Sequence, residues 1–220
     1  MTRGRTRGRA ALLAVLPWLL STGCLPAVEG EPSPAPSGAD LPASPEELEE
    51  LVVTDVPSGL PRLPDDQLDP PAGAKRMADI AHYADDPARE MDVLEEFGYR
   101  YGWERFWGSG SGPLTGVFVD QFESRAGAGA YAEDLARNDA EHYDADLQED
   151  PLHLPGGCRM LTVTEADAGP GTQLAGPAAF VWCGHGVFSV AVTAVAESMD
   201  AAEDEVRAVL GEQLDRLPPG

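Results

Sequence analysis

The sequence predicts an α+β fold, an antiparallel β-sheet with helices packed on a face and one disulfide. Short apolar runs are joined by turn residues, as at Gly184-His185-Gly186, which is typical of β-hairpins. Longer stretches with apolar residues at helical spacing separate the strand-like runs, a pattern that favours helices on an antiparallel sheet. Cys158 and Cys183 form an even pair once the N-terminal Cys24 is set aside.

The N-terminus has the pattern of an export signal. Four arginines between residues 3 and 9, with no acidic residue among them, precede an apolar run from Ala10 to Leu20. This run has 11 residues, whereas a membrane-spanning helix needs about 20. We therefore expect residues 1–23 to be a signal peptide that is removed, rather than a membrane anchor.

The residues Ser21-Thr22-Gly23-Cys24 resemble the bacterial lipobox, whose cysteine receives diacylglycerol before cleavage. The match differs from the commonest form, because Leu20 lies one place early and Ser21 takes the usual leucine position. The resemblance implies lipidation of Cys24 and attachment to the extracytoplasmic face of the cell membrane, since two or three acyl chains anchor a protein stably. An ordinary secretory signal that ends at a chance cysteine is the alternative.

Residues 24–45 are expected to comprise the lipidated cysteine and a disordered tether. Pro, Ser, Ala, Gly and Glu dominate this segment, and such a composition cannot bury a core. At about 3.1 Å per residue, an extended tether would hold the domain up to roughly 60 Å from the bilayer. Residues 46–217 are long enough for a single α+β extracytoplasmic domain.

The first half of this domain is predicted from apolar spacing and from proline and glycine positions. Leu51–Val53 is a short apolar run and a candidate first strand, and residues 57–71 contain five prolines and must be irregular. Helical spacing predicts helices over 75–83 and 87–97, with Pro87 in a first turn. Alternation then predicts a strand over 99–107.

The second half is predicted to add one strand and a long helix, then three strands and a final helix. Ser124 is the predicted N-cap of the long helix, and Ser198 or Asp200 that of the final helix. Pro218-Pro219 stops the final helix. The predicted elements are a turn at 108–113, a strand at 116–122, a helix from 124 to about 147, strands at 159–165, 178–183 and 187–196, and the final helix.

Several segments together resemble a group of actinobacterial secreted lipoproteins and sensor-like domains of unknown function. The residues that carry the resemblance are Asp55 to Asp66, Phe97 to Trp107, Val117 to Ala132, and the closing hairpin VWCGHGVFSVAVTAV with the C-terminal helix. The resemblance implies a cell-envelope location and carries over no catalytic residue. A fainter similarity is to the extracellular sensor domains of mycobacterial receptor kinases.

The cysteine pair predicts a disulfide between Cys158 and Cys183, because exported chains with paired cysteines are usually oxidised. Closing a loop of about 25 residues would stabilise the domain by roughly 3 to 4 kcal/mol. The alternative is a catalytic Cys183 working with His185, which would share one face of a strand with it. No third group that would orient such a pair is evident.

An aromatic stripe is the most informative feature for binding. Strand alternation places Tyr99, Tyr101, Trp103 and Trp107 on one face, together with Arg105. Such a stripe is usually core. Where it is left uncovered it forms a candidate binding groove, because large exposed apolar patches mark interaction sites.

Charge and short motifs exclude several functions. The chain has 15 basic and 38 acidic residues, a formal net charge of −23, so nucleic-acid binding is not expected. Gly127-Ala-Gly129 resembles part of a dinucleotide-binding motif without its second parallel strand, and the acidic run 144–150 lacks the glycine and glutamate of a calcium loop. The four histidines lack ligand spacing. We predict no catalytic residue, no metal site and no cofactor.

The sequence therefore favours a non-enzymatic cell-surface lipoprotein whose sensor-like domain binds a ligand or an envelope protein. The alternatives are an extracytoplasmic hydrolase with an unrecognised carboxylate pair and a purely structural envelope protein. A cleft that holds two acidic side chains with strongly shifted pKa values would favour the hydrolase.

Overall fold

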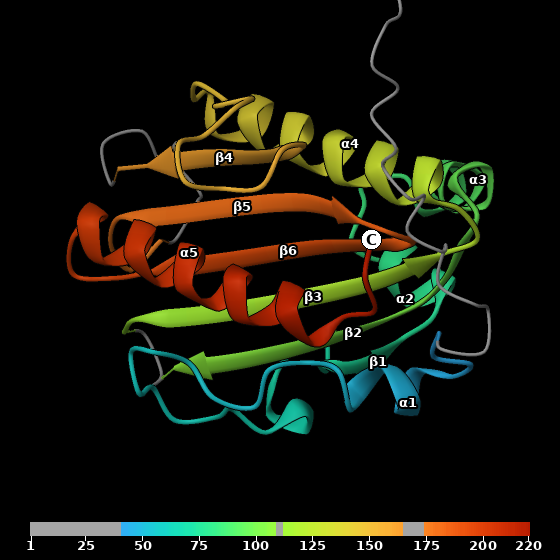
Figure 1. Cartoon of the computed structure of the whole chain (residues 1–220), viewed down its shortest axis with the longest axis horizontal. Coiled ribbons are helices and arrows are strands. Elements are labelled where there is room, and N and C mark those ends of the chain that lie inside the picture. The colour runs from blue at the N-terminus through green and yellow to red at the C-terminus, as the bar shows by residue number, and fades with distance from the viewer. Residues whose placement is uncertain (1–40, 109–111, 165–173) are drawn as a thin grey trace, which may run out of the picture. The chain divides into compact units, whose positions relative to one another are not determined.

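The computed structural model describes residues 41–108, 112–164 and 174–220, and Figure 1 shows their arrangement. The predicted signal peptide, Cys24 and the tether up to residue 40 lie outside the described residues. The described residues belong to one compact unit. No helix in the described ranges is long and apolar enough to cross a membrane.

Among the described residues, six strands form one sheet in the order β1-β2-β3-β6-β5-β4, and every neighbouring pair is antiparallel. Antiparallel pairing follows from the short β2–β3 and β5–β6 connections, because a parallel pair needs a long crossover. The predicted α+β fold is confirmed. The strands are β1 (Gly73–Lys75), β2 (Tyr99–Gly108), β3 (Leu114–Phe122), β4 (Cys158–Val163), β5 (Ala178–His185) and β6 (Phe188–Val195).

The helices begin where side-chain caps satisfy their first backbone N–H groups. Ser124 accepts from the backbone of Gly127, and Ser198 accepts from the backbone of Ala201, as predicted for the two long helices. Gly98 adopts the left-handed conformation that ends α3. The helices are α1 (Pro45–Glu49), the 3₁₀ helix η1 (Asp65–Gln67), α2 (Met77–Ala81), α3 (Pro87–Phe97), α4 (Arg125–Tyr143) and α5 (Met199–Arg216).

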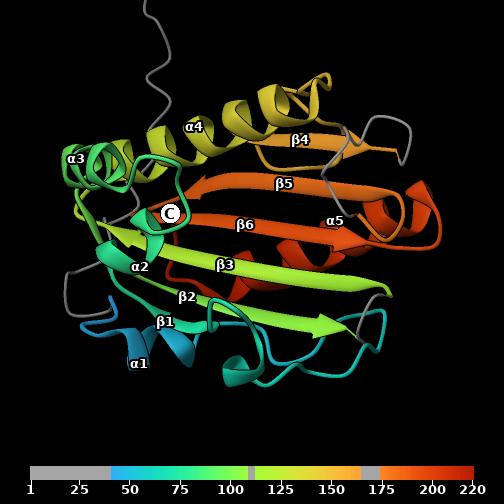
Figure 2. The same ribbon diagram turned by 180° about the vertical axis from the view of Figure 1, so that it is seen from behind.

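Both faces of the sheet carry helices. Helix α5 and the segment 48–56 pack on one face, where their apolar side chains join those of all the strands except β1. Helix α4 packs on the other face over β4, β5 and β6, and α2 and α3 lie at one end of it (Figure 2). We call these the α5 face and the α4 face.

The predicted first strand at Leu51–Val53 is wrong, because this segment is irregular chain after α1. Val52 and Val53 are fully buried, as an apolar run should be, but side chains satisfy their backbone groups. Arg105 donates to both carbonyl oxygens, and Gln213 accepts from the Val53 N–H. The segment therefore needs no partner strand.

Two helix boundaries also differ from the prediction. Residues 73–75 pair with β2 as the edge strand β1, so the helix predicted from Lys75 begins at Met77. Helix α4 ends at Tyr143 rather than near residue 147, because Asp144 turns into the left-handed conformation. Residues 109–111 of the predicted turn and Glu165 of a predicted strand lie outside the described residues.

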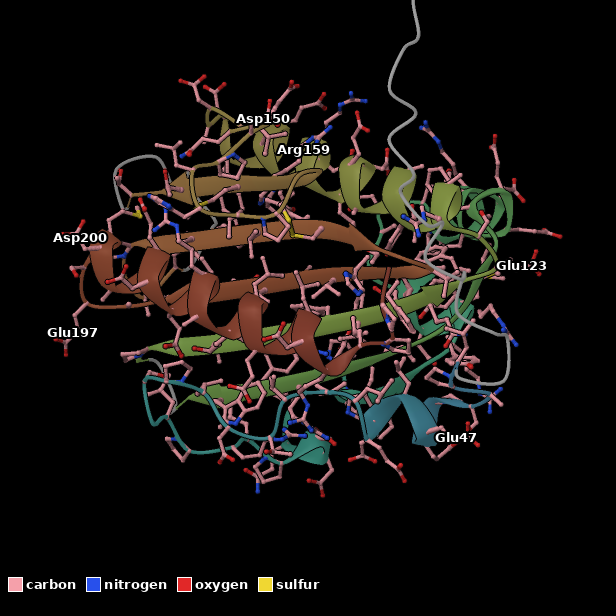
Figure 3. All side chains as sticks on the ribbon, viewed as in Figure 1. Glu47, Glu123, Asp150, Arg159, Glu197 and Asp200 are labelled. Carbon is pink, nitrogen blue, oxygen red and sulfur yellow. A yellow bond between two sulfur atoms is a disulfide. The ribbon has the colours of Figure 1, made fainter. Side chains whose placement is uncertain are left out.

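The predicted disulfide is confirmed. Cys158 and Cys183 are directly opposite each other on β4 and β5, and their sulfur atoms are 2.03 Å apart. The bond is visible between these strands in Figure 3. The disulfide takes Cys183 out of the alternative catalytic pairing with His185, whose Nε2 lies 3.0 Å from the Pro218 carbonyl oxygen.

Candidate functional site

The aromatic stripe does not lie on a single face. Tyr101, Trp103 and Trp107 pack in the α5-face core, where they are 8%, 8% and 1% exposed. A register shift between residues 99 and 101 puts Tyr99 on the α4 face, where its ring meets those of Phe122 and Tyr131. The expectation that all four aromatic residues share one face is therefore corrected for Tyr99, because a β-bulge reverses the alternation of side chains. All four side chains are buried.

The same register brings together ionisable side chains on the α4 face. In neighbouring strands Lys75 is opposite Gly102, Gly102 is opposite Asp120, and Asp120 is opposite Ser189. Glu104 lies two residues beyond Gly102 on the same face. Tyr99 and Tyr83 complete a group that we call the polar layer: Lys75, Tyr83, Tyr99, Glu104 and Asp120.

An ion pair occupies the edge of the polar layer. Lys75 Nζ lies 2.9 Å from Glu104 Oε2, and the Tyr83 hydroxyl donates to the same oxygen at 3.1 Å. Burial acts to lower the pKa of Lys75, but hydrogen bonds with Tyr83 and Glu104 outweigh it, so this pKa is raised. Burial also raises the pKa of Glu104, although Lys75 opposes the shift. The pair is thus formed at the cost of removing both charges from water.

Asp120 lies on β3, further from the edge of the sheet, and is 7% exposed. Burial raises the pKa of its carboxyl group to about 7, and the nearby charge of Glu104 adds to this shift. The Tyr99 hydroxyl is hydrogen-bonded to the carboxyl group and opposes the shift. A Cβ atom at Gly102 would lie 2.1 Å from Asp120 Oδ1, so the carboxyl group occupies space that only glycine leaves free.

Two buried oxygen atoms of this region have no hydrogen-bond partner among the residues that the structure describes. They are Glu104 Oε1 and Ser189 Oγ, in residues that are 4% and 1% exposed. Buried polar atoms are normally hydrogen-bonded, and an unsatisfied one is costly. Perturbed carboxyl groups and unsatisfied atoms in one place make the polar layer a candidate functional site.

A groove between α3 and α4, the α3–α4 groove, is the second candidate. It has a volume of 500 Å³, and Val93 and Phe97 form part of its lining. Glu90 of α3 and Asp134 of α4 both line it; burial raises the pKa of Glu90, and the Asp134 charge raises it further. The charged groups in its lining are Arg89 and the carboxylates Asp85, Asp86, Glu90, Glu96 and Asp134. Its electrostatic potential is therefore negative.

The remaining motifs have structural explanations. A Cβ atom at Gly127 would lie 1.9 Å from the Phe97 carbonyl oxygen, and one at Gly184 would lie 3.0 Å from Gly129 Cα. Gly127 therefore allows α4 to approach α3 closely, and Gly184 allows β5 to approach α4 closely. Within residues 41–108, 112–164 and 174–220, no three His, Cys, Asp or Glu side chains are placed to hold a metal ion.

The residues of the polar layer are visible in the sequence, but their convergence on one face of the sheet is not. Lys75 and Asp120 are 45 positions apart in the chain, and the alternation that marked the aromatic face of β2 also places Glu104 on the opposite face. Each charged residue taken singly is typical of a solvated surface. The one signal available in the sequence was a charged residue, Asp120, within an otherwise largely apolar strand.

In the part of the chain that the structure describes, these features define an α+β protein with one antiparallel sheet, which carries on one face a layer of ionisable side chains that are all buried except Tyr83. Neither a protein-family model nor a curated protein sequence matches the chain. Among solved structures, the chain is similar to one described as the extracellular domain of PknH from Mycobacterium tuberculosis, with a TM-score of 0.47 and 12% identity. The match covers 80% of this chain and 97% of that one. A likeness at this level transfers no property of that domain to this protein.

Proposed function

We propose that this chain is a lipoprotein on the extracytoplasmic face of the cell membrane, anchored through Cys24, whose α+β domain binds a ligand or partner without catalysis. The lipobox-like sequence that ends at Cys24 carries the proposal of location. The Cys158–Cys183 disulfide supports it, because disulfides persist in oxidising compartments and are rare in the cytosol.

The α3–α4 groove is the proposed binding site. Glu90 and Asp134 repel each other across it, and a cation placed between them would relieve that repulsion. Val93 and Phe97 add apolar surface to the same groove. The best-matched ligand therefore carries a positive charge next to an apolar group, either as a small molecule or as a basic segment of an envelope protein.

Lipidation is tested by labelling cells that produce the full chain with radioactive palmitate. We expect the label in the wild-type protein, together with recovery in the membrane fraction. The Cys24→Ser variant should lose both, and the Cys158→Ser/Cys183→Ser variant should keep the label. Incorporation that persists in Cys24→Ser would contradict the anchor.

Binding is tested by titrating the mature domain with decyltrimethylammonium below its critical micelle concentration. The Glu90→Gln/Asp134→Asn variant is expected to bind about tenfold more weakly, because two partly exposed charges each contribute up to about 1 kcal/mol. Glu149→Gln/Asp150→Asn makes the same change of charge in an exposed loop and should leave affinity unchanged. Equal losses in both variants, or equal binding of neutral decyl maltoside, would contradict a specific cationic site.

One observation favours the alternative of a hydrolase. Glu104 and Asp120 are two interacting carboxyl groups with raised pKa values, as an acid–base pair requires. Both are nearly buried, however, and neither lines the α3–α4 groove. Water-soluble carbodiimide with an amine nucleophile, followed by peptide mass mapping, separates the two functions. We expect no modification of either residue in the folded protein, whereas their modification would favour an open catalytic site.

A further inference from the structure

The polar layer buries more negative than positive charge. Lys75, Glu104 and Asp120 are 2%, 4% and 7% exposed. With Lys75 charged and both carboxyl groups ionised, the layer would carry one uncompensated negative charge. An unpaired buried charge is expensive, and such a site generally neutralises itself instead.

The hydrogen atoms available to the layer lead to the same conclusion. All three N–H groups of Lys75 are used, since the ammonium group contacts the Pro71 carbonyl oxygen, the Tyr83 hydroxyl and Glu104 Oε2. The Tyr83 hydroxyl has one hydrogen, which also goes to Glu104 Oε2. The Tyr99 hydroxyl lies beside the Asp120 carboxyl group and 3.5 Å from the Lys75 carbonyl oxygen, so its one hydrogen serves only one of these acceptors. Glu104 Oε1 has no donor among the described residues. The layer lacks one hydrogen.

Access limits what could supply that hydrogen. Glu104 Oε1 is buried from solvent, and the Asp120 carboxyl group lies against the backbone of Gly102. A metal ion or an organic cation would need space that the folded side chains fill. A proton needs no such space and reaches buried groups through small fluctuations of the structure.

We propose that the polar layer is a proton-binding site, in which Asp120 and Glu104 together hold one proton in the folded domain and Lys75 balances the remaining charge. The site does not rest on the proposed binding function, because no residue of the α3–α4 groove takes part in it. It gives the domain a built-in response to the pH outside the membrane.

The groups around Asp120 come from several elements. The groups that face it or act on its charge are Lys75 of β1, Tyr99 and Glu104 of β2, Ser189 of β6 and Tyr131 of α4. Glu90 and Asp134 act on Tyr131 from further out, and the charge of Asp79 on α2 acts on Glu104. Of these groups, Lys75 is the one that favours the ionised carboxylate by its charge, and its hydrogen bonds are already committed to the Glu104 side of the layer.

The first experiment measures the protonation of Asp120 directly by NMR in the wild-type mature domain. Carboxyl ¹³C shifts are followed against pH, and Asp120→Asn identifies the Asp120 signal by its absence. We expect the Asp120 signal to titrate near neutral pH, whereas an unperturbed aspartate titrates near pH 4. Titration of Asp120 near pH 4 would overturn the proposal.

The second experiment tests whether the proton is shared. Glu104→Gln removes one of the two negative charges, which leaves Lys75 to pair with Asp120. We expect the Asp120 titration to move down by at least one pH unit in this variant, whereas Glu149→Gln in an exposed loop should not move it. An unchanged Asp120 titration in Glu104→Gln would overturn a proton held jointly by the two residues.

The third experiment measures how protonation of Asp120 is coupled to folding, and it needs no assignment of NMR signals. The unfolded chain loses the Asp120 proton near pH 4 and the folded chain keeps it to a higher pH. As the pH rises through that interval, this proton alone should therefore lower the folding equilibrium constant about tenfold per pH unit. Asp120→Asn should remove this component, and the exposed Asp146→Asn should keep it. If the folding equilibrium constants of wild type and Asp120→Asn changed in parallel with pH, the proposal would be contradicted.

Discussion

Gly102 determines whether the polar layer can form, because any side chain at this position would collide with the Asp120 carboxyl group. We expect Gly102→Ala to destabilise the domain by about 2 to 4 kcal/mol, through overpacking and the loss of buried hydrogen bonds. Urea denaturation measures this change in the free energy of unfolding.

Asp120→Ala provides the matched test of the Gly102 prediction. The double variant Gly102→Ala/Asp120→Ala should lose less stability than the sum of the two single losses, since removal of the carboxyl group makes room for the new methyl group. Strictly additive losses would show that the collision is not the cause.

Asp139 of α4 has a partly buried carboxyl group, and this burial raises its pKa to about 6. The folded protein therefore keeps a proton on Asp139 that the unfolded chain loses near pH 4. Stability should fall by about 1.4 kcal/mol per pH unit between about pH 4 and pH 6 from this residue, and its contribution should be constant above that range. Asp139→Asn should remove this component of the pH profile of unfolding. A variant profile parallel to that of the wild type would refute the prediction.

Helix α4 contains two glycines that are close in sequence and opposite in environment. A Cβ atom at Gly127 would lie 1.9 Å from a backbone oxygen of α3, whereas one at Gly129 would meet no atom within 4 Å. Gly127→Ala should therefore destabilise the domain by about 2 to 4 kcal/mol, because the helices must move apart. Gly129→Ala should stabilise it by about 0.5 to 1 kcal/mol, since alanine is the better helix former.

Thermal unfolding of the two glycine variants gives the sign of each change. Shifts in the same direction would mean that the contact between α3 and α4 does not depend on the small residue. Opposite shifts would also account for the Gly127-Ala-Gly129 sequence through helix packing, with no nucleotide involved.

Strand β2 shows how one element serves both faces of the sheet. Trp103 and Trp107 fill the α5-face core, while Gly102 and Glu104 lie in or beside the polar layer. Arg105 also faces the α5 side, where it holds the carbonyl oxygens of residues 52 and 53 and pairs with Glu49 at 3.0 Å. Strand β2 therefore holds residues 52 and 53 on the α5 face and places Glu104 on the α4 face.

The disulfide acts on the stability of the domain as a unit. It joins β4, which lies at the sheet edge opposite β1, to β5, and the two cysteines are 25 residues apart in the chain. Closing such a loop should stabilise the fold by about 3 to 4 kcal/mol, mainly by restricting the unfolded chain. Cys158→Ala/Cys183→Ala should lose this amount in urea denaturation.

Reduction of the wild-type protein should give the same loss of stability as the double cysteine variant, and a reductant should not affect the variant. Equal stability of the oxidised and reduced wild-type protein would contradict the prediction.

Acidic side chains surround the domain, as Glu47, Glu123, Asp150, Glu197 and Asp200 illustrate in Figure 3. The full chain has a formal net charge of −23, and such an acidic surface disfavours anionic partners and supports the choice of a cationic ligand for the α3–α4 groove. The polar layer differs from this surface because its charges are removed from solvent and interact strongly.

Features that depend on residues close together in the chain were predictable from the sequence. The caps at Ser124 and Ser198, the hairpin after Cys183 and the alternation of β2 are local signals, because hydrogen bonds and side-chain direction within a few residues decide them. The Cys158–Cys183 bond was predictable because only two cysteines remain after Cys24. The export signal and Cys24 stay predictions from the sequence.

Features that depend on the register between distant strands required the folded structure. Three features depend on contacts between segments far apart in the chain. They are the bulge that reverses Tyr99, the burial of residues 52 and 53 without a partner strand, and the convergence of Lys75, Glu104 and Asp120. A carboxyl group's pKa follows from its burial and its neighbours, and neither is a property of the residue type. The same aspartate that is ordinary in the sequence therefore becomes a proton site only when β2 and β3 lie side by side.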